Sequence, residues 1–256
     1  MIKIDNFEVV GWEHAIRGMR NPMNSWSRSD SFVCKEGDPV EMCNSCPDNG
    51  HCKVIDDEDH YIIGNNDQQL MMKLAKGGPV HAKYRRMITV YVDILAPLYW
   101  WKEFDTYKVG TVANSCSTMH KIHAKEFTLD DFSHDHLTFY ENNEPYANWY
   151  CGVDHDICYS AGGILEHVII PMLNTQRKLY IDTKNKKYWW NIIQLLPSSY
   201  NQKRTVMLNY EVLHNIYISR KNHKLDCWLE FCDWIKKLPY SEIITMEEPE
   251  NEVSEM

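Results

Sequence analysis

The chain has 256 residues, 44% of them apolar, and a formal net charge of -9 with a pI near 5.7. This length and apolar content are sufficient to bury a core in one large domain. The acidic balance excludes broad binding to nucleic-acid backbone, which draws its affinity from neutralisation of phosphates by Lys and Arg.

The same composition argues against a membrane or secreted protein. The longest apolar runs, Ile88–Val92 and Ile94–Trp101, are shorter than the roughly 20 residues of a membrane span. Acidic residues interrupt positions 1–20, which lack the apolar centre of a secretory signal. We therefore expect a cytoplasmic protein with no membrane partner. Its nine cysteines are then better read as thiols or metal ligands than as a disulfide framework.

The N-terminal half predicts a loop, a helix and a strand. Residues 25–58 are rich in Ser, Asp, Gly, Asn, Pro and Cys and lack an apolar period, which predicts a long loop with a Cys-rich insertion at about 31–58. After it, Asn66 or Asp67 is expected to cap a helix that ends at Gly77. Residues 87–95 are β-branched and predict a central strand that is buried on both faces.

The insertion also contains a candidate zinc site. Cys34, Cys43, Cys46 and Cys52, with His51 adjacent, could supply tetrahedral ligands. The spacing lacks the paired Cys-x2-Cys form, so unpaired loop thiols are the favoured reading and we predict no metal. A second pair, Cys151 and Cys158, is flanked by Asp and His residues, and a solvated turn is the favoured reading there.

Beyond the strand over residues 87–95, the chain is predicted to become mainly helical only after residue 163. Residues 98–104 are aromatic and apolar, and residues 105–117 have the composition of a binding loop between core elements. Residues 125–163 show no clear period. Helices are predicted over 168–183, 187–196, 206–220 and 225–235, and the Glu-rich residues 246–256 are expected to be a disordered tail. The sequence contains neither a Walker-type loop nor a Gly-x-Gly-x-x-Gly fingerprint, which argues against a Rossmann domain.

A family resemblance begins after Ala96-Pro97. The chain carries Thr106-Tyr107-Lys108, then Thr111 and, after one extra residue, Asn114 and Ser117. This order resembles the loop motif of the flavin-dependent thymidylate synthases, Arg-His-Arg-x-x-Ser-x-Asn-x-x-Ser-x-Arg-Tyr. The chain departs from that motif at Thr106 and Tyr107, which replace Arg and His, and at Met119, which replaces the last Arg.

The second part of the resemblance lies late in the chain. Leu196-Pro197, Asn209, Asn215 and Arg220 reproduce the family's spacing without a gap, with His223 just beyond. One position departs from it, because Glu211 stands where the family carries Arg. Upstream, the family's Glu-His pair falls on Arg86-Met87.

The resemblance implies a fold and a reaction. The fold would be α/β (α+β), with a central, mostly antiparallel sheet flanked by helices, in one thymidylate synthase-complementing-protein-like domain over residues 1–245. The reaction would be methylation of dUMP to dTMP, with flavin adenine dinucleotide (FAD) as cofactor and with methylenetetrahydrofolate and NADPH as co-substrates. The assembly would be a homotetramer with active sites between subunits.

The resemblance also implies roles for individual residues. Ser117 and Arg220 would be catalytic and would bind dUMP together with Arg86 and Glu103, and the expected FAD ligands are Thr106, Tyr107, Lys108, Asn114, Asn209, Asn215 and His223. Each has a structural alternative: Arg220 complements a helix C-terminus, Asn209 caps a helix, and Asn215 is a solvated position. A degenerate relative that only binds a pyrimidine nucleotide or a protein partner, and a zinc-stabilised interaction protein, are the alternative functions.

Overall fold

The computed structural model describes residues 2–34, 60–139, 150–151 and 158–246. The chain divides into two compact units. The first unit comprises residues 1–5, 93–106 and 113–206, and the second comprises residues 6–92, 107–112 and 207–256.

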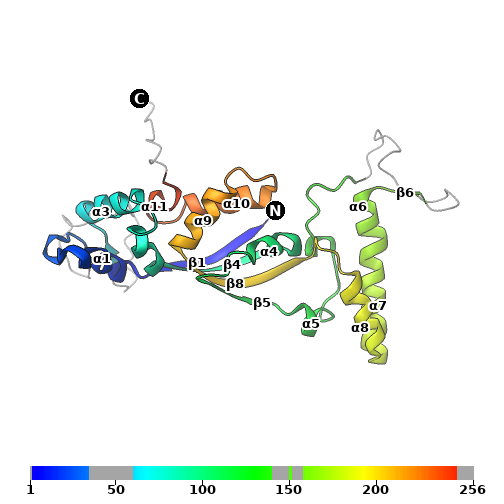
Figure 1. Ribbon diagram of the computed structural model, residues 1–256. Coiled ribbons are helices and arrows are strands. Elements are labelled where there is room, and N and C mark those ends of the chain that lie inside the picture. The colour runs from blue at the N-terminus through cyan, green and yellow to red at the C-terminus, as the bar shows by residue number, and fades with distance from the viewer. Residues whose placement is uncertain (1, 35–59, 140–149, 152–157, 247–256) are drawn as a thin grey trace. The chain divides into compact units, whose positions relative to one another are not determined.

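The main sheet has four strands in the order β1-β4-β8-β5. They are β1 (Lys3–Val10), β4 (Thr89–Pro97), β8 (Asn201–Asn209) and β5 (Thr111–Ser115), and Figure 1 shows them as arrows. The predicted fold class, a mixed α/β fold with a central antiparallel sheet flanked by helices, is confirmed.

Strand β4 was expected from its β-branched residues. Val90, Val92, Ile94 and Ala96 alternate along it and are fully buried, as one face of a pleated strand should be. Tyr91 on the other face is 44% exposed. The strand is therefore confirmed, but the expectation that both of its faces are buried is wrong.

Strand β8 replaces the first turn of a predicted helix. The expected helix over 206–220 is wrong for residues 206–209, which extend β8, and helix α9 (Tyr210–Arg220) follows directly. Gln202, Val206 and Leu208 are buried at even spacing, which is the period of a strand. Asn209 has extended backbone angles and ends the strand where the helix begins.

The first unit contains a helical hairpin. The chain forms a short π-helix (Leu165–Ile169) that continues into α7 (Ile170–Thr183), and α8 (Lys186–Leu195) packs back against α7 (Figure 1). Both long helices confirm their predictions. In their core, Leu165, Ile170, Leu173 and Ile192 of these helices pack with Ile122, Phe127 and Phe132 of the segment before them. The remaining elements are α4 (Leu98–Phe104), α5 (Thr118–Lys121), η5 (Leu129–Asp131), α6 (Ala161–Ile164) and the paired strands β6 (Tyr150–Cys151) and β7 (Cys158–Tyr159).

The second unit is mainly helical. Its elements are α1 (Trp12–Arg20), η1 (Asn21–Met23), η2 (Trp26–Arg28), β2 (Phe32–Cys34), β3 (His60–Ile62), α3 (Asn65–Lys76), η4 (Ala82–Met87), α10 (Asp226–Lys236) and α11 (Glu242–Thr245). Helices α3 and α10 were expected. The predicted end of α3 at Gly77 is confirmed, but the predicted N-cap, Asn66 or Asp67, is wrong. The N-cap is Gly64, and the carboxylate of Asp30 accepts the backbone N–H groups of Asn66 and Asp67.

The long loop expected over 25–58 is only partly described. Its first part contains η2 and strand β2, which pairs antiparallel with β3. Residues 35–59 and 247–256, and with them Cys43, Cys46, His51, Cys52 and most of the predicted tail, lie outside the described residues. Within the described ranges no helix has the length and apolarity to cross a membrane, and no three His, Cys, Asp or Glu residues gather as metal ligands would.

Candidate functional site

Two segments that the sequence singled out meet in the second unit. Arg220 lies in the last turn of α9, and its Nε donates to the phenol oxygen of Tyr107 at 2.9 Å. Its guanidinium carbon is 4.8 Å from the ring centre of Trp228 and 5.7 Å from that of Tyr107. Residues 113 positions apart therefore converge on one half-buried cation with aromatic neighbours.

His223 completes what we call the Arg220 cluster, defined as Tyr107, Arg220, His223 and Trp228. The backbone N–H of Leu225 donates to His223 Nδ1 at 3.2 Å, and the imidazole centre is 6.3 Å from Trp228. A neutral imidazole with Nδ1 as acceptor carries its proton on Nε2. The cluster thus combines a half-buried guanidinium with the half-buried Tyr107 and the fully buried Trp228, and a guanidinium suits an anionic ligand.

Asn209 acts first as a helix cap. Its side-chain oxygen accepts the backbone N–H of Val212 at 3.0 Å. Gly110, with φ +82°, lies against the side-chain amide, and a Cβ at this glycine would be 3.0 Å from Asn209 Nδ2. The cap uses only the oxygen of the amide, so the nitrogen stays a donor.

Three further predicted ligands of the second unit lie on its surface. Lys108 and Arg86 are exposed, and Asn215 is an exposed residue in the middle of α9. Among the described residues the side chains of these three show no hydrogen bond or ion pair. Asn215 therefore matches the solvated alternative in this chain.

The departure at Glu211 has a local explanation. Glu211 is buried, and its Oε2 lies 2.8 Å from Nε of the buried Arg85, whose Nη1 donates to the carbonyl of Ile243 at 3.0 Å. An arginine at position 211 would place two buried cations together, which is unfavourable. The neighbouring His214 makes a 2.6 Å hydrogen bond with the carbonyl of Ile244, and burial lowers its pKa.

The first unit has a lysine-rich pocket around Ser117. We call it the Ser117 pocket, and its volume is about 510 Å³. Its polar lining includes the cations Lys121, Lys125 and Lys203 and the acids Asp130 and Asp131. Lys125 pairs with Asp131, and Lys203 Nζ is 2.9 Å from Asp93 Oδ2, whose hydrogen bond raises the lysine's pKa. Lys121 forms no ion pair within the part of the chain that the structure describes.

Ser117 is fixed by local contacts. Its Oγ accepts the backbone N–H of His120 at 3.0 Å and lies 2.9 Å from His120 Nδ1, so it caps α5. The preceding Cys116 is tied to β8, because its N–H donates to Lys203 O at 2.9 Å and its carbonyl accepts from Gln202 Nε2 at 2.9 Å. A hydroxyl and three ammonium groups therefore line one pocket that can hold a phosphate.

The other predicted residues of the first unit do not line this pocket. Thr106 donates from Oγ1 to the carbonyl of Glu103 at 2.7 Å and closes the end of α4. Asn114 is exposed on β5. The structure thus brings Ser117 together with lysines that the sequence reading missed. Lys121 and Lys125, which follow Ser117 closely in the sequence, and Lys203 at an outward position of β8 were the available signals.

Solved structures with the same fold were found over nearly the whole chain. Thymidylate Synthase X (ThyX) from Helicobacter pylori, with FAD and dUMP, aligns with a TM-score of 0.57 over 96% of this chain and 98% of its own, at 13% identity. The chain has the ThyX fold. The UMP/dUMP methylase PolB from Streptomyces cacaoi, bound with 5-Br UMP, aligns with a TM-score of 0.52 over 96% of this chain and 94% of its own, at 12% identity. No protein-family model and no curated protein matches the sequence.

Proposed function

We propose that the chain is a flavin-dependent methylase of a pyrimidine nucleotide, converting dUMP to dTMP with methylenetetrahydrofolate and NADPH. The observation that carries the proposal is the Ser117 pocket, in which a predicted substrate residue lies among three lysines, in a chain with the ThyX fold. The relatives with this fold include one crystallised with FAD and dUMP and one named as a UMP/dUMP methylase.

The Ser117 pocket would hold the nucleotide. Of the lysines that line this pocket, Lys121 is the one without an acidic partner in the described chain, so it is best able to neutralise a phosphate. The Ser117 hydroxyl would hydrogen-bond the nucleotide. Arg86, Glu103 and Arg220 remain proposed substrate contacts, and Ser117 and Arg220 proposed catalytic residues, on the family resemblance alone.

The Arg220 cluster would hold the flavin. Bound FAD would supply the hydride-transfer chemistry between the reduced nicotinamide and the one-carbon unit, so the protein would need no cysteine nucleophile. Arg220 would donate to a ring carbonyl or a phosphate, and the half-buried Tyr107 would lie against the ring system. Trp228 is fully buried and would hold the guanidinium in place, and His223 remains a proposed FAD contact. Thr106, Lys108, Asn114, Asn209 and Asn215 remain proposed FAD contacts, with Asn209 limited to its amide nitrogen.

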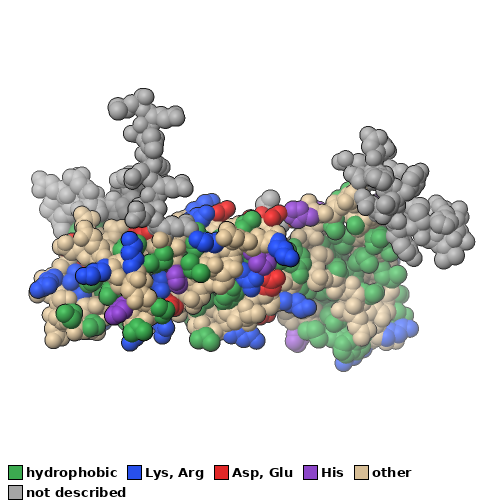
Figure 2. All heavy atoms as spheres, turned by 45° about the horizontal axis from the view of Figure 1, so that its top comes forward, with side chains coloured by type: hydrophobic (Ala, Val, Ile, Leu, Met, Phe, Trp, Pro, Cys, Tyr) green, Lys and Arg blue, Asp and Glu red, His purple; other side chains and the backbone are tan. Residues whose placement is uncertain are grey.

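The helical hairpin supports association with further copies of the chain. Figure 2 shows a broad apolar surface over this part of the molecule. Its large exposed apolar side chains are Val168, Met172, Ile181, Trp190 and Leu195. Apolar patches of this kind mark association surfaces. We propose the family's homotetramer, in a cytoplasmic protein, and sedimentation velocity tests the assembly.

The test of the function combines a spectrum with turnover. A visible absorption spectrum of the freshly purified protein should show bound flavin, and NADPH oxidation should require both dUMP and methylenetetrahydrofolate. Replacing Arg220 with Ala should weaken ligand affinity about tenfold or more, since a charge-assisted contact contributes roughly 1.5–3 kcal/mol. Lys121→Ala should raise the KM for dUMP, whereas Lys178→Ala, a change at an exposed lysine of α7, should not. Protein without flavin and without turnover would refute the proposal.

A second function is favoured by the departures from the family motif. Glu211 neutralises Arg85 where the family carries an arginine, and Tyr107 engages Nε of Arg220. A relative that binds the nucleotide without catalysis would show both features. Calorimetric binding of dUMP with no turnover in the presence of FAD, NADPH and folate would select this function over the first.

A further inference from the structure

The second unit contains a cavity that neither the Ser117 pocket nor the Arg220 cluster includes. It lies among α1, η2, β2 and β3 and has a volume of about 360 Å³. We call it the Arg20 cavity. Its lining includes the aromatic residues Trp26, Phe32 and Tyr61 and the polar residues Arg20, Ser29 and Ser31, and Glu13, Ile16, Arg17 and Val33 complete it. Aromatic, aliphatic, hydroxyl and charged side chains therefore share one small concave site, a composition typical of small-molecule sites.

Trp26 forms a flat, partly exposed wall of this cavity. Its side chain is 49% exposed, which is unusual for so large an apolar group. The indole Nε1 donates to Asn21 Oδ1 at 2.8 Å, so the ring is held in place and its one donor is already used. What Trp26 offers a ligand is thus the face of its ring, which stacks on flat heteroaromatic groups.

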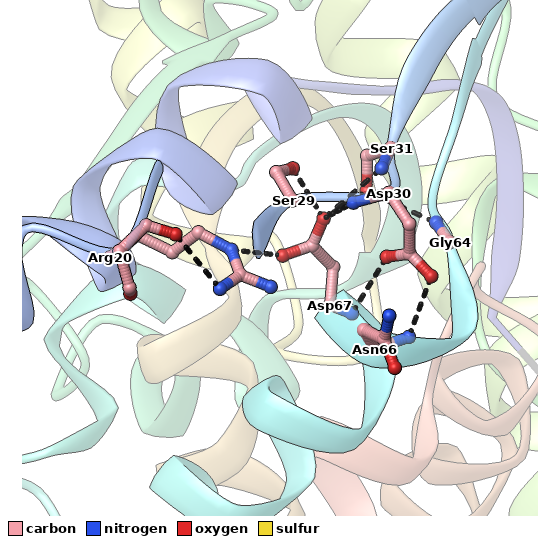
Figure 3. Close-up of polar contacts among 8 residues, drawn as sticks. Arg20, Ser29, Asp30, Ser31, Gly64, Asn66 and Asp67 are labelled. Atoms are coloured by element: carbon pink, nitrogen blue, oxygen red, sulfur yellow. Dashed lines mark hydrogen bonds and ion pairs between the residues drawn. The ribbon is translucent and has the colours of Figure 1, made fainter. Parts of the chain in front are cut away.

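Arg20 supplies a donor at the floor. The residue is only 4% exposed, its Nε donates to Asp67 Oδ1 at 2.6 Å, and its Nη1 donates to Ser25 O at 3.2 Å. Nη2 makes no hydrogen bond with any residue of the described ranges, and in Figure 3 it carries no dashed line. A buried guanidinium that lines a cavity with an unused N–H donor is prepared for an acceptor atom of a ligand.

The two serines supply acceptors. Ser29 Oγ and Ser31 Oγ donate to Asp67 Oδ2 at 2.6 and 2.7 Å (Figure 3). Each hydroxyl has one proton, so both protons are committed to Asp67 and the oxygens can only accept from a ligand. Ser31 Oγ already accepts the N–H of Gly64 at 3.0 Å, which leaves Ser29 Oγ as the less occupied acceptor. Arg20 and Ser29 are held by the two oxygens of a single carboxylate and therefore lie side by side.

We propose that the Arg20 cavity binds a heteroaromatic lactam, a flat ring whose edge carries a carbonyl next to a ring N–H. The carbonyl would accept from Arg20 Nη2, the N–H would donate to Ser29 Oγ, and the ring would stack on Trp26. An amino-substituted ring presents the reverse order, with a donor facing the guanidinium and an acceptor facing the serine. The inference is independent of the proposed methylase function, because it uses no residue of that site.

Inosine and adenosine test the lactam edge directly. They differ at position 6, where inosine has the carbonyl beside N1–H and adenosine has the amine beside an unprotonated nitrogen. In calorimetric titrations of the full-length protein, inosine should bind at least about fivefold more tightly than adenosine. Equal affinities, or no binding of inosine, would overturn the proposal.

Trp26 provides the matched variants. Trp26→Ala should weaken inosine binding roughly tenfold or more, as loss of a stacking partner does, and Trp26→Phe should restore part of the affinity. Tyr91→Ala removes an aromatic side chain of similar exposure, 44%, from β4 and should leave binding unchanged. Unchanged affinity in Trp26→Ala with a native melting temperature would contradict the stacking role. Competition by riboflavin, dUMP or folic acid then identifies which class of natural lactam displaces inosine.

Discussion

The second unit contains two buried arginine–carboxylate pairs that are built differently. Asp67 is fully buried and accepts hydrogen bonds from Arg20 Nε, from the hydroxyls of Ser29 and Ser31, and from the backbone N–H groups of Asp30 and Ser31 (Figure 3). Glu211 is buried beside Arg85, with its Oε2 2.8 Å from Nε in a contact that lacks hydrogen-bond alignment.

The two carboxylates differ in how many groups they hold in place. The carboxylate of Asp67 organises a whole turn, because five donors from α1 and the 29–31 segment converge on it. Glu211 neutralises one cation and organises little else. A buried charge is stabilising only where enough hydrogen bonds replace its lost hydration, so Asp67 should be much harder to replace than Glu211.

The largest effect should come from Asp67→Asn. The change leaves the buried Arg20 without its counter-charge and removes one acceptor for the serine and backbone donors. We expect a loss of about 3–5 kcal/mol in the free energy of unfolding, measured by urea denaturation. Asp182→Asn, at an exposed position of α7, should change it by less than about 0.5 kcal/mol. A loss under 1 kcal/mol at Asp67 would remove the distinction drawn between the two pairs.

The next largest loss in the free energy of unfolding should come from Glu211→Gln. It leaves Arg85 buried without its partner, although Nη1 keeps its bond to the carbonyl of Ile243. We expect a loss of about 3 kcal/mol by the same urea measurement. A larger loss in Glu211→Gln than in Asp67→Asn would contradict the expectation that Asp67 contributes more to stability.

Removing both charges of a pair sharpens the comparison. Arg85→Met with Glu211→Leu should lie within about 1 kcal/mol of the native protein, since a buried pair of this kind is often replaceable by apolar residues. Arg20→Met with Asp67→Leu should stay strongly destabilised, because the donors of Ser29, Asp30 and Ser31 would still lose their acceptor. Equal tolerance of the two double changes would contradict this account.

The contribution of the Asp67 hydrogen bonds to stability should decrease at acid pH. Burial alone would raise the pKa of Asp67, but the hydrogen bonds from Ser29, Ser31 and Arg20 outweigh it and lower the pKa below its ordinary value. With a lowered folded-state pKa, the stabilisation is present above the unfolded value of about 3.9 and is lost as the pH falls through the folded value. Urea midpoints measured from pH 5 downward should therefore decrease, and Asp67→Asn should flatten this dependence.

The smallest expected effect is a change in the pKa of His214, which lies near the Arg85–Glu211 pair. Burial lowers its pKa, and Glu211 is one of the groups that raise it. Because the folded-state pKa is depressed, the neutral imidazole is favoured in the native state, and stability falls as the pH drops below about 6.5 toward the folded value. In Glu211→Gln the pKa of His214, followed by NMR titration, should fall further. A rise would mean that the carboxylate does not act on the imidazole.

The parts of the fold that the sequence predicted are those with a regular apolar period. Residues 168–183 and 225–235 repeat their apolar side chains at helical spacing, and the structure has helices there. Strand β8 was missed at 206–209 because Asn209, Leu213, Ile216 and Arg220 share one helical face, which extended the helix backward past its cap. Strand β1 and helix α1 were not predicted, since polar residues at Asp5, Asn6 and Glu8 interrupt the strand pattern.

The candidate site was predictable to a different degree in each unit. The spacing of family residues pointed to Arg220 and Tyr107, and the structure joins them by a hydrogen bond. Lys121 and Lys125 follow Ser117 closely in the sequence, but Lys203 reaches the pocket because β8 passes beside Cys116, a contact between residues 87 positions apart that no local pattern encodes. Glu211 departs from the family motif, and its role became clear only from the structure, where it pairs with the buried Arg85.

Asn209 has one further consequence. Its oxygen starts α9, while its nitrogen faces Gly110, so replacement by alanine would disturb the helix and any ligand contact at once. Aspartate caps helices as well as asparagine does but offers no amide donor. Asn209→Asp is therefore the substitution that isolates recognition from folding at this residue.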